Sequence, residues 1–189
     1  MARLAVFASG TGTNFAALAE GVSDTAHDLA YLICNVPNAP VIEKARSRNI
    51  PVHIVSYRGR PRSAAEADIE AILTDDPVDL IALAGFMKIL SPRLVDRFRF
   101  VNVHPSLLPR HPGTHAVERS FNAGDAELGV TVHQVDHGVD TGPILAQARF
   151  RRAEATTLDE VERRIHILEH TLYPKVVVGL LDAVGRSNS

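Results

Sequence analysis

Asn102 and His104 stand at the end of an apolar run, and their types and spacing suit the stabilisation of an oxyanion. Residues 100–103 have the pattern of a buried strand, and side chains two positions apart on a strand share a face. Pro105 and Pro109 fix φ in the segment that follows and keep it out of a ladder or helix. We expect an amide and an imidazole side by side at the carboxyl edge of a sheet, where open α/β sheets bind ligands.

A role for His104 as a charged donor requires a protonated ring. Its ordinary pKa of about 6.5 needs a neighbouring carboxylate to raise it. The segment 136–143, Asp-His-Gly-Val-Asp-Thr-Gly-Pro, offers Asp136 and Asp140 in a turn between two strand-like runs. Spacing does not rank the two, and a solvated Asx-turn residue is the alternative for either. A structural histidine, buried among apolar residues, is the alternative for His104.

The glycine-rich loop after the first apolar run predicts an anion site. Unpaired backbone N–H groups and the helix dipole favour negative charge where a helix begins. The two glycines allow close approach of the backbone, and the polar residues add donors. The loop lacks the third glycine of the dinucleotide motif, and it lacks the lysine of a Walker A loop. A single phosphate is therefore the expected ligand, with a plain tight turn as the alternative, for Gly10, Thr11, Gly12, Thr13 and Asn14.

Another loop, Ala84–Ser91, is apolar although it follows a predicted strand. It is suited either to the wall of a pocket for a flat organic ligand or to core packing beneath a short helix. Arg62 ends a basic segment that reads as a solvated loop. His133 and Glu169 gain no role from their spacing alone.

Short apolar runs alternate with helical patterns through the first 110 residues. Such a pattern is typical of a parallel sheet covered on both faces, and so of an α/β, Rossmann-like fold. Gly21 is the expected stop of the first helix, and Ser91-Pro92 is the expected start of the fourth. The expected strands are 3–8, 29–34, 52–55, 80–83 and 100–103, and the expected helices are 15–20, 41–48, 63–74 and 92–98.

The pattern changes after residue 110. A short helix over 116–122 precedes two strand-like runs, 128–135 and 143–150, which we expect to pair as an antiparallel addition near the C-terminus. Thr157-x-x-Glu160 is a capping box that opens a long helix, and Pro174 should kink or interrupt that helix. Residues 1–189 are expected to form a single domain with a frayed tail from about residue 186.

Composition narrows the class of protein. The 189 residues carry 46% hydrophobic and 22% charged residues and a net charge of −2, which is ordinary for a globular domain and gives no field for nucleic acid or a membrane surface. The single cysteine, Cys34, lies in an apolar run and is expected to be a buried structural thiol in a reducing compartment. No leader or spanning segment is recognisable. We therefore expect a cytoplasmic protein without a metal site.

Several of these segments together resemble one family. Asn-Val-His-Pro-Ser-Leu-Leu-Pro over 102–109 and Asp-x-Gly-Val-Asp-Thr-Gly-Pro over 136–143 are similar to the two signatures of the 10-formyltetrahydrofolate-dependent formyltransferases. Segments 9–14, 84–91 and 112–115 resemble the branch of that family whose acceptor is glycinamide ribonucleotide. The resemblance covers about residues 3 to 180. It implies a transfer of a formyl group from 10-formyltetrahydrofolate to the amine of that acceptor.

The resemblance also implies roles for individual residues. The catalytic trio corresponds to Asn102, His104 and Asp140. The phosphate and ribose of the acceptor correspond to Gly12, Thr13, Asn14 and Glu169. The folate corresponds to Arg62, Met87, Lys88, Ile89, Leu90 and Asn102. No metal is implied, and a monomer or homodimer is expected.

Three alternatives remain at this point. A tRNA formyltransferase shares the catalytic signature but usually carries a basic carboxyl-terminal domain. A formyltetrahydrofolate hydrolase usually carries an added amino-terminal regulatory domain. We expect neither extension here. A non-catalytic nucleotide-binding module would keep the phosphate loop but has no need of Asn102, His104 and Asp140.

Overall fold

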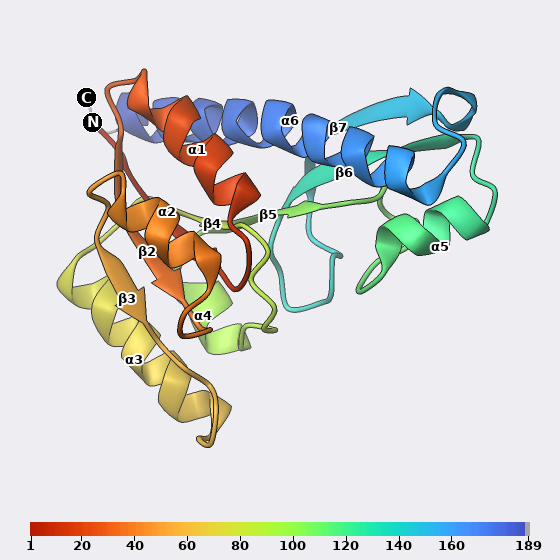
Figure 1. Cartoon of the computed structure of the whole chain (residues 1–189). Helices are drawn as coiled ribbons and strands as arrows, with labels where there is room; N and C mark the ends of the chain where they lie inside the picture. The colour runs from red at the N-terminus through yellow and green to blue at the C-terminus, as the bar shows by residue number, and fades with distance from the viewer. Residues whose placement is uncertain (188–189) are drawn as a thin grey trace.

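A seven-stranded mixed sheet forms the centre of the structure, a computed structural model that describes residues 1–187 (Figure 1). The strand order is β3-β2-β1-β4-β5-β6-β7. Strands β1 to β5 are parallel, whereas β6 pairs antiparallel with both β5 and β7. The strands are β1 (Arg3–Ala8), β2 (Asp28–Cys34), β3 (Val52–Ile54), β4 (Leu80–Leu83), β5 (Phe100–His104), β6 (Glu127–Gln134) and β7 (Ile144–Arg151). The expected α/β, mostly parallel fold with its antiparallel addition is confirmed.

Helices cover both faces of this sheet. Figure 1 shows α1, α2 and α6 on one side and α3 and α4 on the other. Alternate residues of β1 enter different cores: Val6 packs with the first group of helices and Phe7 with the second. This explains why parallel strands here are continuous apolar runs. The helices are α1 (Thr13–Ser23), α2 (Pro40–Arg46), α3 (Arg62–Asp75), α4 (Pro92–Arg97), α5 (Ala116–Asn122) and α6 (Leu158–Ser187), with a 3-10 turn, η1 (Arg152–Glu154), before α6.

The expected stop of α1 at Gly21 and the expected interruption of α6 at Pro174 are wrong for the same reason. Helix α1 continues past Gly21 to Ser23, and α6 continues through Pro174. The two residues face each other, since a Cβ added at Gly21 would lie 2.7 Å from the Cβ of Pro174. The glycine therefore serves the close packing of α1 on α6 rather than helix termination, and this packing overrides the local signals.

Two further expectations concern the ends of α6, namely the capping box at its start and the frayed tail at its end. The capping box is confirmed, because the backbone N–H of Thr157 donates to Glu160 Oε2 at 3.1 Å and the N–H of Glu160 to Thr157 Oγ1 at 3.3 Å. The helix includes residues 186 and 187, so the expected frayed tail does not begin at 186. Residues 188 and 189 lie outside the described part of the chain. Across residues 1–187 no helix is long and apolar enough to cross a membrane.

The pairing register of β5 and β6 determines which residues lie opposite the catalytic candidates of β5. In the antiparallel pair β5–β6, Asn102 lies opposite His133 and His104 opposite Thr131. The switch in strand order falls at β1, whose neighbours are β2 and β4. The loops after β1, β4 and β5 therefore meet at one edge of the sheet.

Candidate active site

Asp140 is the carboxylate that meets the two polar residues of β5. Its Oδ2 lies 3.1 Å from His104 Nδ1, and Asn102 Nδ2 lies 3.5 Å from its Oδ1. Asp136 instead closes its own turn by accepting from the Gly138 N–H at 3.0 Å and the Thr141 hydroxyl at 2.7 Å. The choice that spacing left open therefore falls on Asp140, which the turn presents from a left-handed backbone with φ 56°.

The electrostatics of the pair formed by His104 and Asp140 differ from the expectation. Burial lowers the pKa of His104, and the raising effects of the His111 carbonyl and the Asp140 carboxylate do not offset it. The expected net increase of the His104 pKa is therefore wrong. For Asp140, burial acts to raise the pKa, but contacts with His133 and the Gly113 N–H, together with the nearby histidine charges, lower it to about 2. Asp140 is thus held as a carboxylate.

The loop that follows β5 covers the catalytic candidates. The carbonyl oxygen of His111 lies 2.9 Å from His104 Nε2, and the N–H of Gly113 donates to Asp140 Oδ2 at 2.7 Å. His111 has a positive φ of 54°, and its ring Nε2 lies 2.9 Å from Asp125 Oδ2. Arg110 reaches the same Asp125 oxygen at 3.2 Å. In this conformation both ring nitrogens of His104 face oxygen atoms of the protein.

His133 is a member of this site that the sequence argument did not identify. Its Nε2 lies 3.2 Å from Asn102 Nδ2 and 3.5 Å from Asp140 Oδ1, and only 2% of the residue is exposed. The alternating pattern of 128–135 contained the signal, because one register of β6 on β5 puts this histidine opposite Asn102. The register itself is not readable from the sequence.

The glycine-rich loop begins α1 and has a cramped backbone. Gly12 has φ 74°, and a Cβ on it would lie within 2.9 Å of three atoms of Val41. Only glycine fits there. Asn14 Nδ2 donates to Glu169 Oε2 at 3.0 Å, which joins α1 to α6 across 155 positions of sequence. Burial raises the pKa of Glu169, against the opposing effect of the Asn14 hydrogen bond. The predicted phosphate loop and the predicted ribose carboxylate therefore lie together.

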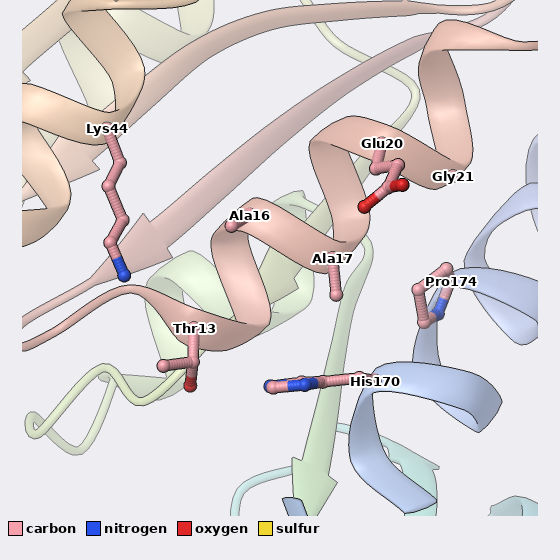
Figure 2. A pocket seen from close by; sticks show the side chains of 8 residues that line it. All are labelled: Thr13, Ala16, Ala17, Glu20, Gly21, Lys44, His170 and Pro174. Carbon is pink, nitrogen blue, oxygen red and sulfur yellow. The ribbon is translucent and has the colours of Figure 1, made fainter. Parts of the chain in front are cut away.

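Beside this loop runs a groove of about 470 Å³ between α1, α2 and α6. Figure 2 shows Lys44 of α2 and His170 of α6 extending into it from opposite sides, with Thr13 between them. The Nε2 of His170 is buried and has no hydrogen-bond partner among the described residues. Burial and the charges of His166 and Lys44 lower the pKa of His170. Lys44 brings a positive charge to this groove, and Glu20, which also lines it, brings a negative one.

The apolar loop after β4 divides between the two roles that the sequence left open. Phe86 and Leu90 are buried in the core, whereas Met87 and Ile89 are 73% and 64% exposed. The Met87 N–H donates to Ser9 Oγ at 2.8 Å, which ties this loop to the one after β1. Phe86 and Leu90 thus anchor the loop on either side of Met87 and Ile89, which face outward.

Arg62 and Lys88 lie on this side of the molecule. Arg62 begins α3 and has its Nε 3.9 Å from Glu66 Oε1, an oxygen that also accepts from the Ser91 N–H at 3.0 Å. Lys88 Nζ lies 5.3 Å from the centre of the Tyr57 ring. Glu66 therefore joins the folate candidates of α3 and of the loop after β4. Within residues 1–187 no hydrogen bond or ion pair connects Arg62 with Asn102, His104 or Asp140.

Metal-binding chemistry has no candidate in residues 1–187, where no group of three or more His, Cys, Asp or Glu side chains could hold an ion. The thiol of Cys34 is buried and donates to the Val36 carbonyl at 3.3 Å. Burial raises the pKa of that thiol.

Comparisons with known proteins agree with this architecture. The formyl transferase model matches residues 2–177. The phosphoribosylglycinamide formyltransferase of Bacillus subtilis is 43% identical over 96% of this chain and 95% of its own length. The trifunctional purine biosynthetic protein adenosine-3 of Drosophila melanogaster is 39% identical over 95% of this chain, which spans 14% of that longer protein. The crystal structure of glycinamide ribonucleotide transformylase 1 from Geobacillus kaustophilus superposes with a TM-score of 0.91, at 44% identity, over 96% of this chain and 99% of that one. The chain belongs to the formyl transferase family.

Proposed function

We propose that this chain transfers the formyl group of 10-formyltetrahydrofolate to the primary amine of glycinamide ribonucleotide. The products are formylglycinamide ribonucleotide and tetrahydrofolate, and the reaction is a step of de novo purine biosynthesis. The observation that carries the proposal is the meeting of Asn102, His104 and Asp140 at the same sheet edge as the loop that begins α1. The B. subtilis relative, similar over nearly its whole length, bears the name of this activity.

The reaction needs stabilisation of charge on the formyl oxygen. The amine of the acceptor attacks the formyl carbon, and an N–H of Asn102 and the imidazolium of His104 donate to the oxygen as it becomes negative. Asp140 interacts more favourably with the charged ring than with the neutral one. We also assign to Asp140 the transfer of a proton from the attacking amine, directly or through water, to the folate N10 as the bond between the formyl carbon and N10 breaks.

The loop conformation adds a step before chemistry. His104 Nε2 faces the carbonyl oxygen of His111 at 2.9 Å, and Nδ1 faces Asp140. A formyl oxygen that accepts from Nε2 must replace the His111 carbonyl. We propose that substrate binding moves the segment around His111 and releases Nε2 for the reaction.

The two substrates are assigned to opposite sides of His104. The backbone of Gly12 and Thr13 at the start of α1 takes the phosphate, and Asn14 and Glu169 are placed near the ribose. Support comes from the cramped backbone of the loop and from Lys44, which extends into the adjoining groove near Thr13 (Figure 2).

The folate is assigned to the other side. Arg62, the backbone of Met87, Lys88, Ile89 and Leu90, and the side chain of Asn102 are proposed to contact it. The outward-facing Met87 and Ile89 and the links through Glu66 support this assignment. Both sets approach the catalytic trio from the loops that meet at one sheet edge, so binding also fixes the approach of the reactants.

One assay tests the activity. Purified protein is given 10-formyltetrahydrofolate with glycinamide ribonucleotide, with initiator methionyl-tRNA, or with water alone, and loss of the formyl group is followed. We expect rapid loss only with glycinamide ribonucleotide. Formylation of the tRNA would favour a tRNA formyltransferase, and equal loss in water would favour a hydrolase. No loss in any arm would favour a nucleotide-binding module.

The proposed function also includes a domain organisation, a location and an oligomeric state. We propose that residues 1–189 form a single formyltransferase domain that acts in the cytoplasm as a monomer or homodimer, without nucleic acid, a membrane or a metal. The buried thiol of Cys34, which is not part of a disulfide, is compatible with a reducing compartment. Light scattering on the eluted protein would distinguish monomer from dimer.

A further inference from the structure

His133 is a buried histidine that the proposed reaction does not use, and it directly faces a residue that the reaction does use. It lies on β6 opposite Asn102 of β5, and residues that face each other across an antiparallel pair project to the same side of the sheet. Its Nε2 lies 3.2 Å from Asn102 Nδ2, whereas Asp140 Oδ1 is farther away at 3.5 Å. The shorter contact is therefore with the amide.

The partner of the other ring nitrogen, Nδ1, determines whether Nε2 of His133 donates or accepts in this contact. His133 Nδ1 lies 2.7 Å from the backbone carbonyl oxygen of Gln134. A carbonyl can only accept, so Nδ1 carries the hydrogen. In the neutral ring Nε2 is then a bare acceptor, and it takes one N–H of Asn102. Only 2% of His133 is exposed, so bulk solvent has little access to that lone pair.

This contact orients the Asn102 side chain. An amide can turn over and exchange its NH₂ and its oxygen at little cost unless neighbours distinguish them. The bare Nε2 accepts the NH₂ and repels the amide oxygen, so it fixes the NH₂ on the side of His133. One N–H is then held, and the second points toward Asp140, where the 3.5 Å contact is too long to bind it firmly.

We propose that His133 is a positioning residue that locks the Asn102 amide and leaves one N–H of Asn102 available to the formyl oxygen. The proposal rests on the proposed function for the role of that N–H. The rival role for His133 is that of a cation that donates from Nε2 to Asp140. In that case His133 would not orient the Asn102 amide, and its positive charge would act on the Asp140 carboxylate.

Two substitutions separate these roles, because each places a polar atom near the position of one of the two ring nitrogens. His133→Gln places an amide oxygen near the position of Nε2, so it can accept from Asn102. His133→Asn keeps a donor near the position of Nδ1 for the Gln134 carbonyl but does not reach Asn102. We expect kcat to fall about tenfold in His133→Asn, the scale of one lost hydrogen bond, and to stay within about threefold of wild type in His133→Gln. KM for both substrates should change little in either variant.

The pair of variants excludes a merely structural role. If His133 only held the fold together, His133→Asn would be at least as active as His133→Gln, and this order would overturn the proposal. If His133 acted as a cation on Asp140, both variants would lose the same activity, which would also overturn it. The matched control is the same pair of changes at His53, at the opposite end of the sheet on β3, where no change of kcat is expected.

A double substitution tests whether His133 acts through Asn102. His133→Asn should cost nothing further in a protein that already carries Asn102→Ala, whereas additive losses would contradict the proposal. NMR gives a readout that does not depend on turnover. One side-chain N–H of Asn102 should be protected from exchange in wild type and in His133→Gln and unprotected in His133→Asn. Equal protection in all three would overturn the positioning role, while an absence of turnover in wild type with this pattern intact would fault the proposed function alone.

Discussion

Asp140 contacts three neighbouring groups, and their combined effect on its pKa is larger than the effect of its burial. It contacts the His104 ring, the Gly113 N–H and the His133 ring. Together these contacts outweigh burial and lower its pKa to about 2. Burial also lowers the pKa of His104, although both of its ring nitrogens face acceptor oxygens, the His111 carbonyl and the Asp140 carboxylate. Protonation of that ring depends on Asp140.

Asp140→Asn should therefore reduce turnover far more than substrate binding. The variant also removes the carboxylate that favours the charged His104 ring, so the pKa of His104 falls further below 6.5. We expect the alkaline limb of the kcat/KM profile, which reports the free enzyme, to move to lower pH. Steady-state kinetics from pH 5 to 9 would check this, and normal turnover with an unshifted limb would remove Asp140 from the mechanism.

His104→Ala removes the charged donor to the formyl oxygen. Loss of one oxyanion donor costs on the order of 100-fold in kcat, and we expect at least that loss with little change in KM. Single-turnover rates with both substrates saturating would measure it. His53→Ala is the control, and a wild-type rate in His104→Ala would contradict the assignment.

Glu169→Gln should make the protein more stable at neutral pH. Burial raises the pKa of Glu169, so the folded state holds its proton more tightly than the unfolded chain, and stability falls as pH rises from about 4.5 through the folded-state pKa. Glutamine avoids this cost and can still accept from Asn14. Thermal melts should show no advantage at pH 4 and a gain at pH 7.5, at about 2–4 °C for each 1 kcal/mol relieved. An equal gain at both pH values would refute the ionisation argument.

At the scale of elements, local sequence signals failed where two elements meet. Gly21 reads as a helix stop and Pro174 as a helix break, yet the contact between them joins α1 to α6. Likewise, the alternation of 128–135 predicted a strand but not its register, and only the register places His133 opposite Asn102. Asp136 and Asp140 could not be ranked because the hydrogen bonds of their turn decide which of them faces β5.

Within the segment between β5 and α5, the side chains of Arg110 and His111 are both bound by one carboxylate, that of Asp125. Asp125→Asn should free this segment for local opening. Because trypsin cuts after arginine, we expect cleavage at Arg110 to become several-fold faster under native conditions. Mass spectrometry of the first fragments would identify the site. Asp159→Asn, on the exposed first turn of α6, is the control, and an unchanged rate at Arg110 would show that Asp125 does not restrain the segment.

For the whole molecule, periodicity predicted what depends on burial alone. The expected strands 3–8 and 80–83 coincide with β1 and β4, since a strand covered on both faces must be apolar throughout. The pairing of Asn102 and His104 on one face followed from the same rule. The His111 carbonyl against His104 could not be predicted, because it depends on a positive φ at a non-glycine residue. The long-range contact of Asn14 with Glu169 depends on how α6 lies across the sheet.

The division of the sheet edge into two substrate sides predicts separable effects of ligands on global unfolding. A ligand at 100 times its Kd stabilises the folded state by about 2.7 kcal/mol, which corresponds to about 5–11 °C in Tm for a domain of this size. Glycinamide ribonucleotide alone and tetrahydrofolate alone should each raise the Tm of wild type by this amount. Asn14→Ala should lose the first rise and keep the second, and Arg62→Ala should do the reverse. Differential scanning calorimetry would measure both, and a variant that lost both rises without a lower Tm of its own would show that the two sides are not independent sites.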